Sequence, residues 1–501
     1  MLAAVVGLHP TRLQGGRHDG STVTTVERPF NKCYNFATIE LAVNNPATEP
    51  SGDDAPLVPD PLPPGPSGPG PLVFANFLAR PGGFLESSKR RYGTPFTFKM
   101  SPRRTVVITD DPAVIKQVFT SDPTKLLAGV GNEVLRPLLG PRSVLTLDEP
   151  EHMRQRKLLL PPFHGDRMKL YGEVIAEATE REMARWPVGE PFAVQQSMQA
   201  ITLEVIMRAV FGVRDDRERM EQIAEPLRRL LDSMADMRRL FTLQVSSSKR
   251  NGPLSPWRHF RRTLLHPADE VLYEEIRTHR ADADVGERDD ILSLLLSARD
   301  EDGEGLTDSE LHDELMTLLL AGHETTATAL SWTLERLVRH PEALARLTEE
   351  ARDGEGGEYM DAVIKESLRL RPVVPAVARY LTEPTELGGR VLPAGVHITP
   401  SIYLTHRNPA IYDEPDRFRP ERFLERPAGT YEWIPFGGGT RRCLGASFAL
   451  FEMRIVLGGV LRRFDVVSAG ERDERIARRA ITFSPARGAR VRLARRPPKA
   501  I

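Results

Sequence analysis

One cysteine lies where it could be held as a thiolate. Cys443 follows three glycines and two arginines in the segment FGGGTRRCLG, 436–445. The periodicity of the next segment, ASFALFEMRIVLGGVL, predicts an amphipathic helix that Cys443 opens, and the helix dipole and the adjacent Arg441 and Arg442 would favour the anion. Glycine permits positive φ and lets a backbone pass close to a flat ligand. We therefore expect a lowered thiol pKa; the alternative for such a segment is an incidental buried cysteine.

A carboxylate and a hydroxyl form a second candidate pair. Glu324 and Thr325 lie in AGHETT, 321–326. Gly322 lacks a side chain, and a threonine can donate to the carbonyl four residues earlier, so both are expected to loosen a helix and leave a groove. Glu324 should face water or a polar network, because a buried unpaired carboxylate is costly. The alternative is a glycine that serves helix packing.

Glu324 and Thr325 lie in a segment that is predicted to form one long helix. Thr307 and Glu310 predict a capping box at its start, and Pro341 should stop it. Such a helix would be ~50 Å long at 1.5 Å per residue. Apolar residues run nearly all round between Leu315 and Leu320, which is typical of a buried helix.

The composition is that of an ordinary globular chain. Of its 501 residues, 40% are hydrophobic and 27% charged, and the formal net charge is -1. That balance gives no reason to expect binding to nucleic acid or to an anionic membrane. The two cysteines, Cys33 and Cys443, exclude a disulfide framework and favour a reducing compartment. No stretch approaches the ~18 consecutive apolar residues of a membrane span.

The chain divides by composition into three parts. Residues 1–58 are expected to be a disordered extension, or the product of a start codon placed too far upstream, and 59–71 a Pro/Gly-rich segment leading into the fold. The remaining part, 72–501, is expected to form one large domain. Its patterns predict mainly α structure with minor β (α+β).

Particular segments carry this fold prediction. Residues 95–110 alternate as a β-hairpin, and 112–299 are mostly helical, with a loop at 246–256. A second β-rich region spans 387–400, and 481–493 is predicted to be another hairpin.

The cysteine segment resembles a known signature. Phe436 to Gly445 matches F-x-x-G-x-R-x-C-x-G, the haem-binding signature of the cytochrome P450 family. The resemblance extends from about residue 70 to the C-terminus and implies a single helical domain with a small β-rich region and a long central helix. It implies that Cys443 is the axial ligand of haem b iron and that Phe436, Gly437 and Gly445 help to bind the cofactor.

Further motifs follow in the family's order. AGHETT resembles the family's acid–alcohol motif, which implies that Glu324 relays protons and Thr325 hydrogen-bonds the oxygen being activated. KESLRLRP and PERF resemble a structural Glu–Arg–Arg cluster. Alone, each of these residues could be an ordinary surface charge. The cluster would contain Glu366, Arg369 and Arg422, and the residues implied for the haem propionates are His152, Arg156, Arg379 and Arg441.

The resemblance also implies a reaction. One atom of O2 would enter an apolar organic substrate by hydroxylation or epoxidation, and the other would leave as water. Two electrons from NAD(P)H would arrive through a separate ferredoxin or flavodoxin and its reductase, docking near Arg442, Arg454 or Lys157. We expect a soluble, cytoplasmic, monomeric protein of bacterial type that binds no nucleic acid. The residues placed at substrate positions are Leu318, Ala321, Val374, Val377 and Phe483.

Three other functions remain open from the sequence. A peroxygenase on the same scaffold would use hydrogen peroxide, although such enzymes usually lack the Glu324–Thr325 pair. A non-enzymatic haem sensor or carrier would not need that pair. A reactive or metal-binding Cys443 without haem would need companion ligands at suitable spacing, which the sequence does not offer.

Overall fold

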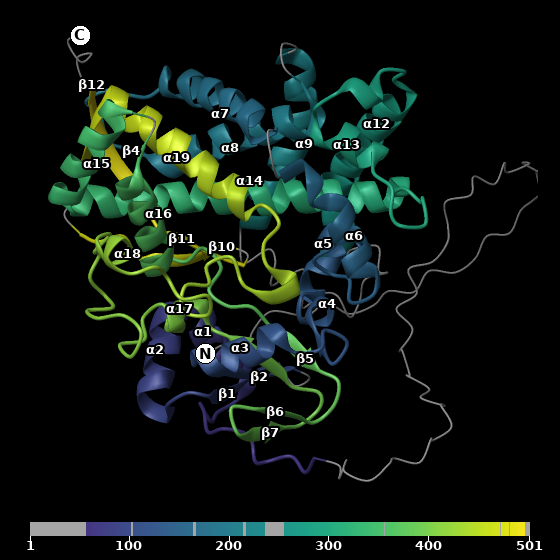
Figure 1. Cartoon of the computed structure of the whole chain (residues 1–501), viewed down its shortest axis with the longest axis vertical. Coiled ribbons are helices and arrows are strands. Elements are labelled where there is room, and N and C mark those ends of the chain that lie inside the picture. Colours follow the sequence, from purple (N-terminus) through teal and green to yellow (C-terminus); the bar gives the residue numbers. More distant parts are fainter. Residues whose placement is uncertain are drawn as a thin grey trace, which may run out of the picture. The chain divides into compact units, whose positions relative to one another are not determined.

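One long helix organises the described part of the chain. The computed structural model describes residues 57–495, apart from 102–103, 164–166, 214–216, 236–254, 355, 471 and 480. Helix α14, Asp308–Arg339, crosses this part, with most other long helices on one side and the largest sheet on the other (Figure 1). The predicted extension at 1–58 and the predicted loop at 246–256 fall almost wholly outside the described residues.

The ends of α14 confirm the sequence prediction. Thr307 Oγ1 accepts from the Glu310 N–H at 3.3 Å, and Glu310 Oε2 accepts from the Thr307 N–H at 2.8 Å, so the capping box is present. The helix ends at Arg339, and Pro341 starts the next helix, where its missing N–H costs nothing.

Helices surround α14. Those that contact it most extensively are α8 Val194–Phe211, α12 His266–Ala281, α16 Glu358–Leu370 and α19 Ala446–Arg463. The others are α1 Gly70–Ala79, α2 Pro81–Tyr92, α3 Pro112–Thr120, α4 Ala128–Gly131, α5 Arg136–Leu139, α6 Glu151–Leu159, α7 Arg167–Met183, α9 Arg217–Ala235, α11 Pro256–Phe260, α13 Ile291–Ser297, α15 Pro341–Asp353, α17 Ile402–Thr405 and α18 Arg422–Glu425.

The strands form one larger and several small sheets. The larger sheet has the order β1-β2-β8-β5-β3 and includes the predicted hairpin of β1 and β2. Only the β2–β8 pairing in it is parallel. Its strands are β1 Phe96–Ser101, β2 Arg104–Thr109, β3 Leu126–Leu127, β5 Arg379–Leu381 and β8 His397–Pro400. The small sheets contain β4 Phe192–Ala193, β6 Thr385–Leu387, β7 Arg390–Leu392, β9 Phe464–Ser468, β10 Ile476–Arg479, β11 Thr482–Pro485 and β12 Arg490–Arg495.

The predicted hairpin at 481–493 is wrong. Strand β11 pairs with β10, whereas β12 pairs with β4 and β9 in another sheet. Pro485 ends β11, and Gly488 and Ala489 take positive φ of 72° and 54°. The chain therefore turns from one sheet into the next instead of folding back on itself.

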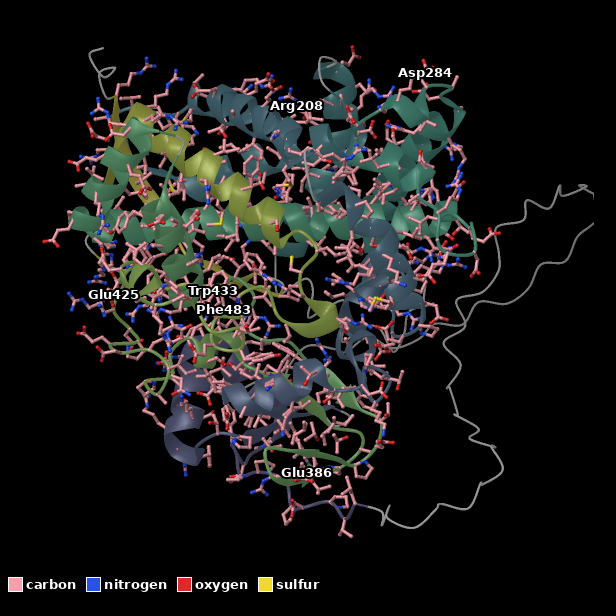
Figure 2. All side chains as sticks on the ribbon, viewed as in Figure 1. Arg208, Asp284, Glu386, Glu425, Trp433 and Phe483 are labelled. Carbon is pink, nitrogen blue, oxygen red and sulfur yellow. The ribbon has the colours of Figure 1, made fainter. Side chains whose placement is uncertain are left out.

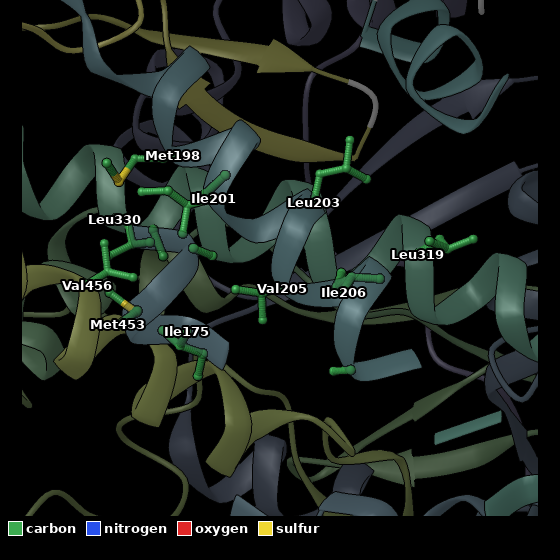
Figure 3. Close-up of a cluster of buried hydrophobic side chains, with 14 of the residues drawn as sticks. Ile175, Met198, Ile201, Leu203, Val205, Ile206, Leu319, Leu330, Met453 and Val456 are labelled. Carbon is green, nitrogen blue, oxygen red and sulfur yellow. The ribbon is translucent and has the colours of Figure 1, made fainter. Parts of the chain in front are cut away.

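Buried apolar side chains form three clusters. The first cluster joins α7, α8, α14 and α19, and Figure 3 shows side chains of these helices, such as Ile201, Leu330 and Val456, meeting between them. The second lies around α3, β5 and β8, and the third between β1, β2 and the first two helices. Each fully buried large side chain contributes about 1.5–3 kcal/mol to folding.

Candidate functional site

The cysteine loop precedes α19. The Cys443 N–H donates to the Phe436 carbonyl at 3.0 Å, which closes the loop around a 3-10 turn, Gly439–Arg441. Helix α19 begins at Ala446, with Gly445 as its N-cap. Cys443 therefore lies just ahead of the helix and does not open it, and the Gly445 N–H faces its sulfur.

The glycines of this loop have different tasks. A Cβ on Gly438 would lie 2.2 Å from Phe119 Cδ2, and a Cβ on Gly439 would lie 2.1 Å from the Phe119 carbonyl oxygen. These two glycines allow the loop to pack against the end of α3. Gly437 has a φ of 68°, and the atom nearest to a Cβ added there would be Val377 Cγ1, at 3.9 Å. Of these three glycines, Gly437 is the one for which a close approach to a flat ligand stays a prediction.

The protein alone does not stabilise the Cys443 thiolate. Cys443 keeps an accessible surface, yet many protein atoms surround its sulfur. Their desolvating effect raises the pKa of the thiol, and the Gly445 N–H, Arg156 and Arg442 only partly offset it. The prediction of a lowered thiol pKa is therefore wrong for the protein alone.

One face of α14 is open. The helix is buried along most of its length, but Ala321 is exposed, and Leu318 and Thr325 are half-buried. Their i, i+3, i+7 spacing puts all three on the same face. An exposed alanine in the middle of a buried helix indicates a face that a ligand can cover.

Helix α14 is not loosened as predicted. Thr325 Oγ1 does donate to the Ala321 carbonyl, but the helix stays regular from Asp308 to Arg339. A Cβ on Gly322 would lie 2.8 Å from Ile206 Cδ1 of α8. The glycine thus serves helix packing, which was the alternative interpretation.

Glu324 lies in a polar network, as its cost of burial requires. Gln199 Nε2 donates to Glu324 Oε2 at 2.7 Å, and Arg479 Nε lies 3.4 Å from Oε1. Burial raises the pKa of Glu324, although Arg479 and Gln199 oppose the shift. Neither partner could be identified from the sequence, because both are more than a hundred residues away.

The preceding residue, His323, also contacts α8. It is buried, and its Nδ1 lies 3.0 Å from Thr202 Oγ1 of α8. Burial lowers the pKa of His323 to about 4, so the ring is neutral at physiological pH. It therefore contributes a hydrogen bond between helices and no charge.

Three arginines and a histidine come together near Cys443. His152 and Arg156 come from α6, Arg379 from β5 and Arg441 from the cysteine loop. Burial, with the neighbouring Arg441, lowers the pKa of Arg379 to about 10. Burial also lowers the pKa of His152, Arg156 and Arg441. Their mutual repulsion would be relieved by a ligand with negative charge.

The donors of these arginines are only partly used. Arg379 donates to the carbonyl of Ala378 at 2.9 Å, and Arg441 donates to that of Leu147 at 2.7 Å and reaches Asp148 at 3.4 Å. Among the described residues no hydrogen bond is formed by the Arg156 guanidinium. Guanidinium groups with free donors are suited to bidentate contacts with carboxylates.

Two acids of α14 hold the loop that supports Arg441. The Arg142 N–H donates to Asp313 at 2.9 Å, and the Val144 N–H donates to Glu314 at 2.6 Å. The Val144 carbonyl in turn accepts from Arg441 at 3.3 Å. Sequence analysis missed both acids, because only the tertiary structure brings this loop to α14.

The predicted structural cluster is assembled and buried. Glu366 accepts from Arg369 at 2.7 and 2.9 Å and from Arg422 at 3.2 Å. Glu366 and Arg369 have no exposed surface. Arg369 also donates to the carbonyls of His406 and Pro415, so the cluster fixes the segment after α17 to α16.

The residues predicted to contact substrate do not all lie together. Leu318 and Ala321 are on the open face of α14, and Val374 and Val377 are partly buried beside the second cluster. Phe483 is 2% exposed and packs against Tyr403 in the third cluster; Figure 2 labels it below α14. Its placement at the substrate is wrong, because β11 turns its ring into that core.

The three cations proposed for partner docking differ in whether they already form an ion pair. Lys157 pairs with Glu301 at 2.6 Å, and Arg454 pairs with Asp361. Arg442 is exposed, and in the described part of the chain no carboxylate pairs with it. Arg442 is the one of the three whose charge is available without breaking an ion pair.

Other kinds of site find no support in the described residues. No group of three or more His, Cys, Asp or Glu side chains there could hold a metal ion. No helix in that part of the chain is sufficiently long and apolar to cross a bilayer.

Comparisons with known proteins agree on one family. The family model for cytochrome P450 matches residues 63–489. Cytochrome P450 135B1 of Mycobacterium tuberculosis is 43% identical over 82% of this chain and 86% of its own length, and cytochrome P450 137 of the same organism is 42% identical over 80% and 83%.

Solved structures share the fold. A crystal structure of the cytochrome P450DA heme domain aligns with a TM-score of 0.75 and 24% identity, covering 88% of this chain and 99% of that one. The retinoic acid bound cyanobacterial CYP120A1 aligns with a TM-score of 0.73 and 24% identity, covering 87% and 100%. At this identity, the likeness concerns the fold.

Proposed function

The chain belongs to the cytochrome P450 family of haem-thiolate monooxygenases, and from that premise we propose that it hydroxylates or epoxidises an apolar organic substrate with one atom of O2. The second atom leaves as water. The observation that carries the proposal is the convergence of Arg156, Arg379 and Arg441, with unused donors, on the loop that holds Cys443.

These residues fit haem b. The Cys443 sulfur would bind the iron, and the cation's charge would stabilise the thiolate that the protein alone disfavours. Arg156, Arg379 and Arg441 would bind the two propionates, with His152 beside them. Phe436, Gly437 and Gly445 would line the sulfur side of the ring. When bound, the haem supplies the redox centre at which O2 is activated.

Glu324 and Thr325 would deliver protons. Thr325 lies on the open face of α14, and its hydroxyl can turn from the Ala321 carbonyl to another acceptor. Glu324 is adjacent, and because burial raises its pKa, its carboxyl group holds a proton more readily than an ordinary glutamate does. Gln199 orients its carboxyl group.

The substrate would lie against Leu318, Ala321, Val374 and Val377. None of these side chains has a polar group, so they favour an apolar body and exclude water from the reacting face.

Electrons would come from a separate protein. We propose a ferredoxin or flavodoxin that receives them from NAD(P)H through its reductase and docks at exposed Arg442 by charge complementarity. Arg442→Glu should slow reduction and spare substrate binding. We propose a cytoplasmic monomer, in which the thiol stays reduced.

The deciding experiment is the absorbance spectrum of the reduced protein with carbon monoxide. A strongly red-shifted Soret band is expected for the wild type, and Cys443→Ser should abolish that shift. A protein that stays colourless when it is given haem would overturn the proposal. Turnover with peroxide but never with an electron donor would favour a peroxygenase.

A further inference from the structure

One arginine beside Glu324 has donors without partners. Arg479 ends β10, its side chain is 26% exposed, and its Nε is buried without a hydrogen bond. Across the described residues its guanidinium forms no hydrogen bond, and its one charged contact is Glu324 Oε1 at 3.4 Å. Arg369, by contrast, uses its guanidinium donors on Glu366 and three carbonyls.

The free donors of Arg479 lie close to the open face of α14. Glu324 adjoins Thr325, and Thr325 shares the open face of α14 with Ala321. Arg479 therefore contacts the residue of α14 that directly precedes Thr325 on this face. The planar fork of a guanidinium matches a carboxylate better than it matches any neutral group.

The other basic side chains nearby are already paired or neutral. Arg228 of α9, which is near enough to lower the pKa of His323, pairs with Glu221 at 2.9 Å and Glu225 at 2.8 Å. His323 is neutral. Arg479 is thus the cation of this group that can still accept an anionic partner.

We propose that Arg479 is a specificity-determining residue, which binds the carboxylate of a substrate whose body is otherwise apolar. The substrate carboxylate takes the place of the weak contact with Glu324 and leaves Glu324 to its neighbour Gln199. This inference rests on the proposed monooxygenase function and narrows its substrate class to apolar carboxylic acids.

The test is a titration of the haem-loaded protein at neutral pH, read from the spin-state change in its absorbance. Two matched pairs of probes are used: dodecanoic acid with 1-dodecanol, and abietic acid with abietinol. Within each pair the body is the same and only the acid group differs. We expect at least one acid to bind about tenfold or more tightly than its alcohol.

Variants separate recognition from structure. Arg479→Gln should abolish the preference for the acid and leave alcohol binding unchanged, while Arg479→Lys should retain part of it. Arg478→Gln is the matched control: it lies next on the same strand, its guanidinium lies over the Phe77 ring at 5.2 Å, and its loss should change neither affinity.

A fourth variant distinguishes the two roles open to Arg479. If it binds substrate, Glu324→Gln removes a competing carboxylate and should tighten acid binding. If it only pairs with Glu324, Glu324→Gln and Arg479→Gln should have the same effect.

The inference is overturned if no acid binds, if neither acid is preferred, or if Arg479→Gln keeps the preference. None of these outcomes contradicts the proposed function, provided that the reduced protein with carbon monoxide still shows the red-shifted band. Loss of that band in the wild type overturns both.

Discussion

At the scale of single residues, burial outweighs the nearest charges in setting the direction of the pKa shift at Cys443 and at Glu324. It raises the pKa of the Cys443 thiol despite Arg156 and Arg442, and it raises that of Glu324 despite Arg479. In both groups burial therefore favours the protonated form, and the neighbouring charges only partly oppose it.

The thiol provides the first prediction. In haem-free protein, the rate of Cys443 alkylation by iodoacetamide should rise at higher pH than for an ordinary thiol, because only the thiolate reacts and its pKa is raised. The measurement is the rate against pH in a Cys33→Ser background, which leaves Cys443 as the reacting cysteine. Bound haem should block the reaction at every pH. A rate profile shifted toward acid would contradict this account.

At the scale of elements, the buried cluster fixes α16 to the segment after α17. Glu366→Gln should lower the free energy of unfolding by about 3–5 kcal/mol, because it leaves two buried guanidiniums uncompensated. Urea unfolding of the haem-loaded protein measures the change. Glu425→Gln is the control: Glu425 pairs with Arg419 at the surface, and its loss should cost less than about 1 kcal/mol. Equal effects would show that the cluster is not structural.

A histidine joins α12 to α14. His312 lies 3.0 Å from Asp269 and 2.9 Å from Asp313, and although burial opposes protonation, these contacts raise the pKa of His312 to about 9. Because the pKa in the unfolded chain is lower, about 6.5, protonated His312 stabilises the fold fully below that pH and loses this effect as pH rises toward 9.

The second prediction at this scale follows from the direction in which the stabilisation by His312 changes with pH. The difference in unfolding free energy between wild type and His312→Gln should be on the order of 3 kcal/mol at pH about 6, and should shrink as pH approaches about 9. Tyr273→Leu removes the ring stacked on His312 at 4.5 Å but no charge, so its cost should not follow this pH dependence. Denaturant titrations across the range measure both. A constant difference for His312→Gln would refute the charged pair.

The elements also show what a sequence can reveal. The capping box of α14 and the turn that contains the loop glycines can be predicted from the sequence, because local hydrogen bonds determine both. The hairpin at 481–493 was not, because β12 finds its partners, β4 and β9, elsewhere in the chain. The sequence does not identify Arg479 for the same reason. The interest of Arg479 lies in its contact with Glu324, and only tertiary packing brings these two residues together.

At the scale of the whole described unit, the candidate site borders two separate cores. Leu318, Phe436 and Leu444 pack against the first cluster, and Val374 and Val377 pack against the second. A haem held by Cys443 would therefore contribute apolar surface to both clusters. The cofactor would then couple the helical part to the sheet in addition to its role in chemistry.

This coupling is testable by hydrogen exchange of the haem-loaded and haem-free protein. Haem stabilises whatever it binds by about 4 kcal/mol at a thousandfold excess over its Kd. Because the centre of α8 and α14 is packed within the first cluster, it should keep its protection without haem, whereas β5, β8 and the loop at 436–445 should exchange faster. Cys443→Ser protein without haem should match the haem-free wild type, which assigns the effect to the cofactor. If protection fell equally everywhere, or only in the loop, haem would not link the two cores.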